Sequence, residues 1–99
     1  MAYNFSAEKK GEHDLPSLHN RLCKYELIEF FPVDVSNEAI TLGISIPFKA
    51  MDDPGFESEV QRSMSYLISD EGFQVTDLYT GNAVAIDEIP GLARRISAD

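Results

Sequence analysis

Hydrophobic and polar residues alternate most regularly over residues 39–48. Successive side chains of a strand point to opposite faces of a sheet, so a period of two predicts a strand here. The aliphatic positions of one face are Ile40, Leu42, Ile44 and Ile46, and the small or polar positions of the other are Thr41, Gly43 and Ser45. This pattern predicts a sheet that is buried on one face and open on the other.

A weaker alternation precedes this strand, over residues 21–35. Its apolar positions are Cys23, Tyr25 and Leu27, and the residues between them are charged. Pro32 has no backbone N–H, which a strand tolerates at the edge of a sheet. Residues 34–38 include turn-forming serine and asparagine. We therefore expect the two strands to form an antiparallel hairpin.

The helical period is clearest over residues 56–68. The apolar stripe consists of Phe56, Val60, Met64, Leu67 and Ile68, at spacings typical of one helix face. Asp53 followed by Pro54 favours a helix start, because aspartate caps the first N–H groups and proline suits the first turn. Gly72 predicts the end of this helix.

A second hairpin is predicted over residues 73–89, with its turn at residues 79–82. The residues that share one face before the turn are Phe73, Val75 and Asp77. Proline and glycine at positions 90 and 91 interrupt the alternation, and a last helical turn is predicted over residues 92–96.

Residues 1–20 are predicted to form an N-terminal arm, and residues 21–99 to form one domain. Residues 6–20 are rich in charged residues and helix breakers. The large apolar side chains of the predicted arm are Tyr3, Phe5, Leu15 and Leu18, of which the first two are expected to fasten its start to the domain. Pro16 favours a short helical turn after it.

The predicted elements run β-β-α-β-β and belong to the α+β class. A right-handed crossover through the helix would place the second and third strands side by side and parallel. The expected architecture is therefore a four-stranded mixed sheet with one helix packed on one face, over the aliphatic side of residues 39–48.

Composition sets the broad class of the protein. The chain has 99 residues, of which 43% are hydrophobic, and this suits one globular domain. It has no apolar run near the roughly 20 residues of a membrane span, and its start lacks the basic and apolar regions of a signal peptide. We therefore expect a cytoplasmic protein. The single cysteine, Cys23, is interpreted as a small apolar filler.

The net charge of −9 argues against partners that are themselves anionic. Nucleic-acid phosphates and anionic membranes both require clustered lysine and arginine. Acidic residues are concentrated in residues 52–88, which hold nine acids and one base, Arg62. A surface of this kind steers association with a basic protein.

No motif in the sequence predicts a metal, a cofactor or a catalytic nucleophile. The soft metal ligands nearest in sequence are His13, His19 and Cys23, and a fourth ligand is missing. The acid pairs at residues 52–53, 70–71 and 87–88 lie at predicted element ends, outside any calcium-loop pattern. Phosphate-cradling and nucleophile-elbow motifs are also absent from the sequence.

Phe30 and Phe31 are adjacent in a predicted strand, so their rings are expected on opposite faces. One of the two rings is then expected to point away from the face that the helix covers. The other aromatic residues expected to join it in an exposed patch are Tyr25, Phe48 and Tyr79. Such a patch indicates an interface, unless the N-terminal arm or the C-terminal turn covers it.

These features favour a non-enzymatic protein-binding module, an inhibitor or adaptor that occupies a basic surface of another protein, for example by mimicking nucleic acid. The predicted partner-binding residues are Glu57, Glu59, Asp87, Glu88, Phe30 and Phe31. One alternative is an assembly subunit that self-associates through the open sheet face or through the edge of the first strand. A second alternative is an enzyme with a scattered carboxylate site.

Overall fold

The computed structural model describes residues 2–98, which contain four strands and three α-helices. Along the chain these are β1 (Ala2–Lys10), α1 (Leu15–Leu22), β2 (Glu29–Val35), β3 (Ala39–Pro47), α2 (Phe56–Ser65), β4 (Gln74–Asp77) and α3 (Ile89–Ala98). The short helical turns are η1 (Phe48–Asp52) after β3, η2 (Tyr66–Asp70) after α2 and η3 (Ile86–Glu88) before α3. The order β-α-β-β-α-β, followed by α3, is that of the split β-α-β arrangement with one added helix.

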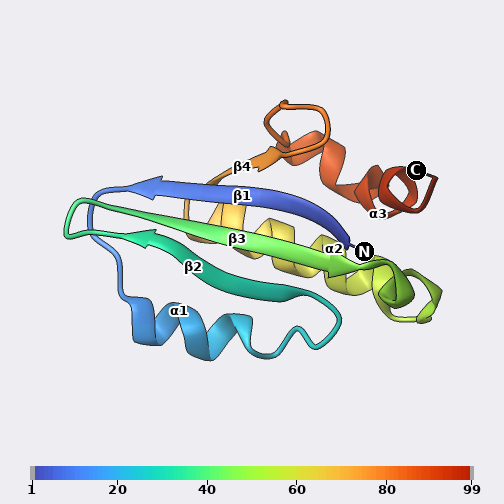
Figure 1. The fold of residues 1–99 in the computed structure, drawn as a ribbon, viewed down its shortest axis with the longest axis horizontal. Helices are drawn as coiled ribbons and strands as arrows, with labels where there is room; N and C mark the ends of the chain where they lie inside the picture. Colours follow the sequence, from blue (N-terminus) through green and yellow to red (C-terminus); the bar gives the residue numbers. More distant parts are fainter. Residues whose placement is uncertain (1, 99) are drawn as a thin grey trace.

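The strands form one antiparallel sheet in the order β2-β3-β1-β4 (Figure 1). β1 lies between two neighbours, because it pairs with β3 from Ala2 opposite Pro47 to Lys10 opposite Ala39, and with β4 on its other side. β2 therefore forms one edge of the sheet. β4 forms the other edge, where Ala83 makes an isolated bridge to Thr76.

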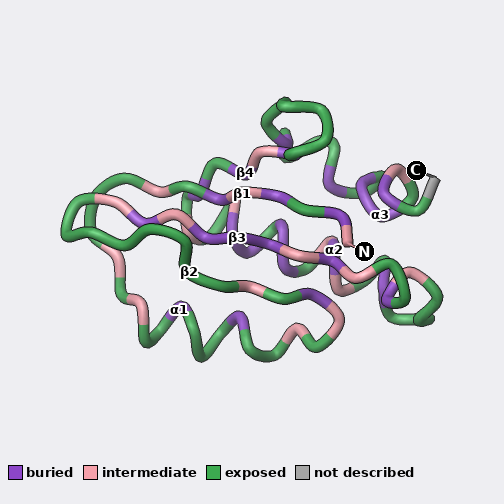
Figure 2. Tube along the Cα trace, viewed as in Figure 1, coloured by how far each residue is buried: buried purple, intermediate pink, exposed green. Residues whose placement is uncertain are grey.

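The predicted buried face of β3 is confirmed. Its four aliphatic side chains are at most 3% exposed, and all three helices contribute to the same core. The predicted antiparallel hairpin of β2 and β3 is also confirmed. Figure 2 shows buried residues recurring along β1, β3 and α2, whereas β2 is exposed along most of its length.

The expectation that residues 6–20 form a loose arm is wrong. Residues 2–10 are the central strand β1, and residues 15–22 are the helix α1. The buried side chains of β1 are Tyr3, Phe5 and Ala7, and they alternate with exposed or half-exposed polar ones. This period of two is weak in the sequence, because the third buried residue is only alanine and the strand ends on two lysines.

The short helical turn predicted at Pro16 is confirmed and is part of the eight-residue helix α1. The carboxylate of Asp14 accepts a hydrogen bond from the backbone N–H of Ser17 at 3.2 Å, and Pro16 occupies the first turn. The alternation over residues 23–27 does not form a strand, so β2 begins only at Glu29. Tertiary context overrides a short alternating pattern here.

The predicted mixed sheet and single helix are also wrong. All strand pairs are antiparallel, because β1 lies where a parallel pair was expected. The predicted second hairpin is reduced to β4 and the single bridge from Thr76 to Ala83. The predicted turn at residues 92–96 is part of the ten-residue helix α3.

The main helix begins and ends close to the predicted positions. α2 starts at Phe56, and the side chain of Asp53 accepts a hydrogen bond from the N–H of Gly55 at 2.8 Å just before it. The helix continues into the π-helical turn η2 and stops before Gly72, whose φ of +76° favours glycine. None of the helices in residues 2–98 is long and apolar enough to cross a membrane.

Candidate functional site

A buried carboxylate organises the β4 edge of the sheet. Asp77, the last residue of β4, is 0% exposed. Its Oδ2 accepts hydrogen bonds from the hydroxyl of Tyr3 at 2.6 Å and from Nη2 of Arg95 at 3.0 Å. Its Oδ1 accepts from the backbone N–H groups of Tyr79 at 2.8 Å and Thr80 at 3.3 Å. The charge is therefore paired, and it ties β1, the loop after β4 and α3 together.

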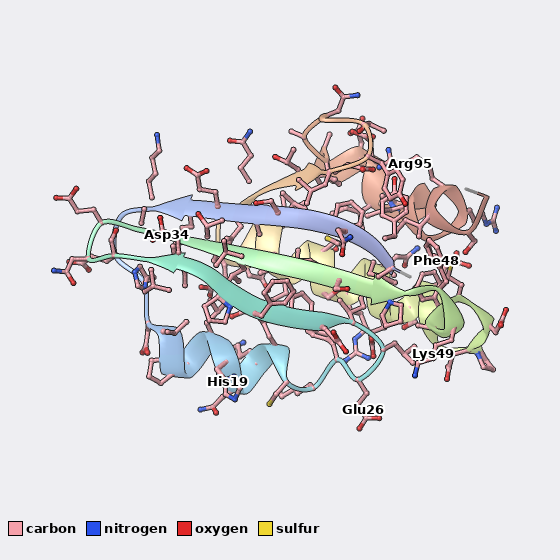
Figure 3. All side chains as sticks on the ribbon, in the orientation of Figure 1. His19, Glu26, Asp34, Phe48, Lys49 and Arg95 are labelled. Atoms are coloured by element: carbon pink, nitrogen blue, oxygen red, sulfur yellow. The ribbon has the colours of Figure 1, made fainter. Side chains whose placement is uncertain are left out.

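Arg95 extends this network to η3. Its Nη1 donates to Oε2 of Glu88 at 3.0 Å, and the other oxygen of Glu88 accepts from the N–H of Ala85 at 3.0 Å. One guanidinium thus links Asp77 to the turn that precedes α3. Figure 3 shows Arg95 at this end of the molecule, beside the loop that follows β4.

Three large apolar side chains stand exposed on the backbone that this network fixes. Leu78 is 58% exposed, Tyr79 62% and Ile86 60%. The ring of Tyr79 stacks on the buried ring of Tyr3, with centroids 4.7 Å apart. We name Leu78, Tyr79, Ile86 and the neighbouring exposed Asp87 the loop surface. Exposed apolar groups on a rigid frame are typical of protein interfaces.

A second exposed apolar group lies at the opposite edge of the sheet. Phe31 is 46% exposed, Val33 63% and Val35 44%, and we name these three residues the β2 edge patch. The ladder between β2 and β3 is irregular between Pro32 and Asp34. Proline and a bulge both interrupt an edge and limit pairing with further strands.

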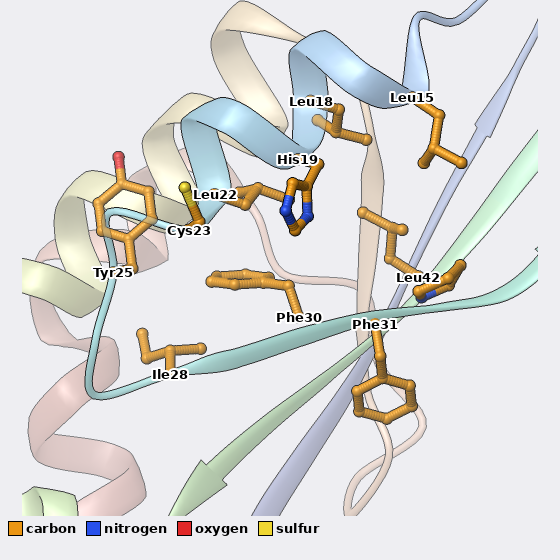
Figure 4. Close-up of a pocket in the computed structure, with 11 residues that line it drawn as sticks. Leu15, Leu18, His19, Leu22, Cys23, Tyr25, Ile28, Phe30, Phe31 and Leu42 are labelled. Atoms are coloured by element: carbon orange, nitrogen blue, oxygen red, sulfur yellow. The ribbon is translucent and has the colours of Figure 1, made fainter.

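The prediction that Phe30 and Phe31 face opposite ways is confirmed. Figure 4 shows the Phe30 ring directed toward α1 and the Phe31 ring on the other side of β2. Phe31 lies on the open face opposite Gly43, where a Cβ would overlap its ring. Glycine at this position lets the ring lie flat against the sheet.

The four predicted acids lie in two separate places. Glu57 is exposed in the first turn of α2. Glu59 is only partly exposed, because its carboxylate accepts a hydrogen bond from the backbone N–H of Leu27 at 2.8 Å. Asp87 and Glu88 lie in η3, and Glu88 is engaged with Arg95. Only the η3 pair adjoins exposed apolar residues, so the six predicted residues do not form one site.

Sequence reasoning missed the residues that shape the loop surface. Asp77 carried a usable signal, because it shares a predicted strand face with Phe73 and Val75. An acid on an apolar face indicates a buried, paired carboxylate. Its partners Tyr3 and Arg95 are 74 and 18 residues away, and no local pattern connects them.

Two of the metal ligands considered in the sequence, His13 and Cys23, make other polar contacts. His13 Nε2 lies 2.7 Å from the carbonyl oxygen of Ser36, and the thiol of Cys23 donates to the carbonyl of Asn20 at 3.2 Å. Within residues 2–98, no three His, Cys, Asp or Glu side chains are grouped so that they would hold a metal ion.

Tyr66 has a shifted acidity at the other end of the molecule. Burial raises its pKa to about 12, and the nearby carboxylate of Glu71 adds to the shift. The residue is 7% exposed in the π-helical turn, and the guanidinium carbon of Arg21 from α1 lies 5.7 Å from its ring centroid. Tyr66 therefore connects the end of α2 to α1.

Comparisons with protein-family models, with curated proteins and with solved structures found no match for this chain.

Proposed function

We propose that the chain is a non-enzymatic protein-binding module that holds its partner on the loop surface. The observation that carries this proposal is the exposure of Leu78, Tyr79 and Ile86, each more than half exposed, on backbone held by the hydrogen-bond network of the buried Asp77 with Arg95 and Glu88. An inhibitor or adaptor would act by occupying a surface of its partner in this way.

The energetics of association support this assignment. Full burial of a leucine- or isoleucine-sized side chain contributes roughly 1.5–3 kcal/mol. The hydrogen bonds from Asp77 and the stacking of Tyr79 on Tyr3 already order the loop. Little conformational entropy is then lost on binding, and tyrosine is among the residues enriched at binding hot spots.

The charge of the chain indicates the kind of partner. Asp87 is exposed beside Ile86, and residues 52–88 carry a net charge of −8 from nine acids and one base. We expect the partner to offer an apolar depression with lysine or arginine at its rim. The acidic half would speed association with such a surface, and a nucleic-acid-binding protein is one class of target.

Affinity capture with matched bait variants tests the proposal. Wild type and Tyr79→Ala are compared with Val33→Ala, which truncates an equally exposed side chain at the β2 edge. We expect Tyr79→Ala to lose the captured protein and Val33→Ala to retain it. With the purified partner, Tyr79→Ala should raise the dissociation rate at least tenfold, whereas Asp87→Lys should mainly slow association. Retention by Tyr79→Ala together with loss by Val33→Ala would contradict the proposal.

A second candidate function is self-association through the β2 edge. It is favoured by the β2 edge patch, because exposed apolar side chains gathered on one surface are typical of an interface and would bury each other through side-chain contacts. Sedimentation equilibrium tests it: the average mass should rise with concentration in the wild type and stay monomeric in Val33→Lys. A monomeric wild type over the whole range would remove this candidate.

A further inference from the structure

A half-open cavity of about 180 Å³ lies between α1 and β2, on the face of the sheet that α1 covers (Figure 4). Leu18 and Leu22 of α1 form one wall, and Leu42 of β3 contributes to another. It is far from the loop surface, because β2 and β4 are opposite edges of the sheet. The cavity therefore has no part in the function proposed above.

The sequence explains why this space stays open. The apolar residues that α1 directs at the sheet are three leucines, Leu15, Leu18 and Leu22, and the first of these is only half buried. The strand beneath the helix is irregular between Pro32 and Asp34. Short aliphatic side chains over a bent edge strand leave a gap that the chain does not fill.

We propose that this cavity binds a small neutral aromatic molecule of one or two fused rings. The size fits, because an apolar protein cavity of about 150 Å³ is large enough to take up benzene. The shape of the lining fits as well. The rings of Tyr25 and Phe30 line the cavity with centroids 6.1 Å apart and planes tilted by 59°. A third ring that lies beside this pair, on its cavity side, gains edge-to-face or stacking contacts with them.

The polar groups of the lining define the charge of the ligand. Within residues 2–98, the cavity lining includes no Asp, Glu, Lys or Arg, so a charged ligand would be desolvated there without an ion partner. The imidazole of His19 and the thiol of Cys23 are the polar side chains of α1 and its C-cap that reach the cavity. They offer hydrogen-bonding groups to a ring N–H or a phenolic hydroxyl.

Indole is the first probe, with cyclohexanol as a comparison of similar size that lacks an aromatic ring. At a concentration ten times its Kd, indole should raise the melting temperature by about 6 °C, because it binds the folded state only. Backbone amide shifts in two-dimensional NMR should change at residues 15–23 and 28–32. Absence of a Tm rise up to the solubility limit, or shifts confined to other regions, would overturn the proposal. An equal rise with cyclohexanol would overturn the aromatic ligand class.

A variant that fills the cavity tests whether indole binds there. Leu15→Trp places a ring in the cavity from its half-buried rim and should weaken indole binding at least tenfold, whereas Val33→Trp adds the same side chain outside it and should bind like wild type. If Leu15→Trp does not fold, Leu18→Phe takes its place. Tyr79→Ala should retain indole binding. The test of the cavity is therefore independent of the test of the loop surface. Unchanged indole affinity in a folded cavity-filling variant would contradict the site.

Discussion

The two edge strands of the sheet are held in place in different ways. At the β4 edge, a four-residue strand ends on a fully buried carboxylate that engages β1, a loop and α3. At the β2 edge, a seven-residue strand with a proline is exposed along most of its length, and α1 covers its inner face over an open cavity. Specific charge pairing thus fixes a short strand, whereas a few leucines leave a longer strand loosely covered.

This difference bears on function. A surface that is ordered before binding loses little entropy on association, and this describes the loop surface. A small ligand that fills a loosely covered apolar space gains contacts with the side chains that line it. The cavity under α1 is a space of this kind. Under the two proposals, the same sheet presents an ordered surface to a protein partner at one edge and an apolar space to a small ligand at the other.

The largest expected effect comes from breaking the strand that joins the two edges. Deletion of residues 6–14 removes half of β1 and should abolish the cooperative thermal transition, because β1 pairs with both β3 and β4. Circular dichroism during heating measures it. A transition that survives with a loss of only a few degrees would mean that this segment is the dispensable arm that the sequence suggested.

Removal of the buried carboxylate tests the difference between the β4 edge and the β2 edge. Asp77→Ala leaves the guanidinium of Arg95 and the hydroxyl of Tyr3 without their shared acceptor, and should reduce the free energy of unfolding by about 3–5 kcal/mol. Asp34→Ala, an exposed acid on β2, should change it by no more than about 0.5 kcal/mol. Urea titrations measure both. Equal losses in the two variants would show that the edges do not differ in this way.

The sequence allowed much of the middle of the fold to be predicted. The aliphatic face of β3 and the stripe of α2 each follow a strong local period, and the turn residues before β3 predict its hairpin with β2; all three are confirmed. β1 was missed because a small alanine and terminal lysines weaken its alternation. Residues 23–27 were misassigned because a short alternation is overridden by packing against the rest of the chain.

The candidate site was less predictable than the fold. The opposite orientation of Phe30 and Phe31 follows from strand geometry alone, and it is confirmed. The position of Glu59 against the backbone of Leu27, and the contact of Asp77 with Tyr3 and Arg95, depend on pairs distant in sequence. Leu78 and Ile86 are exposed where the predicted second hairpin is reduced to β4 and a single bridge, and no local pattern indicates this reduction.

The smallest expected effect concerns alkaline pH and the α1 side of the molecule. The pKa of Tyr66 is about 12 in the folded protein and near 10 in an unfolded chain. Below pH 10 both states keep the phenol protonated, so the stabilisation is fully present. Between pH 10 and 12 the unfolded state loses this proton first, and the free energy of unfolding should fall by about 2–3 kcal/mol.

The matched variant isolates this contribution from the other groups that titrate in the same range. Tyr66→Phe should show a shallower loss of stability between pH 10 and 12, whereas Tyr79→Phe, at an exposed position, should follow the wild type.

Because Tyr66 packs beneath Arg21 of α1, amide exchange in α1 should accelerate before exchange in α3, which is held by Arg95 and its carboxylates. Urea titrations and hydrogen exchange over this pH range measure the two effects. Exchange that accelerates equally in both helices would mean that the molecule opens as a single unit, and that the loose edge and the fixed edge share one stability.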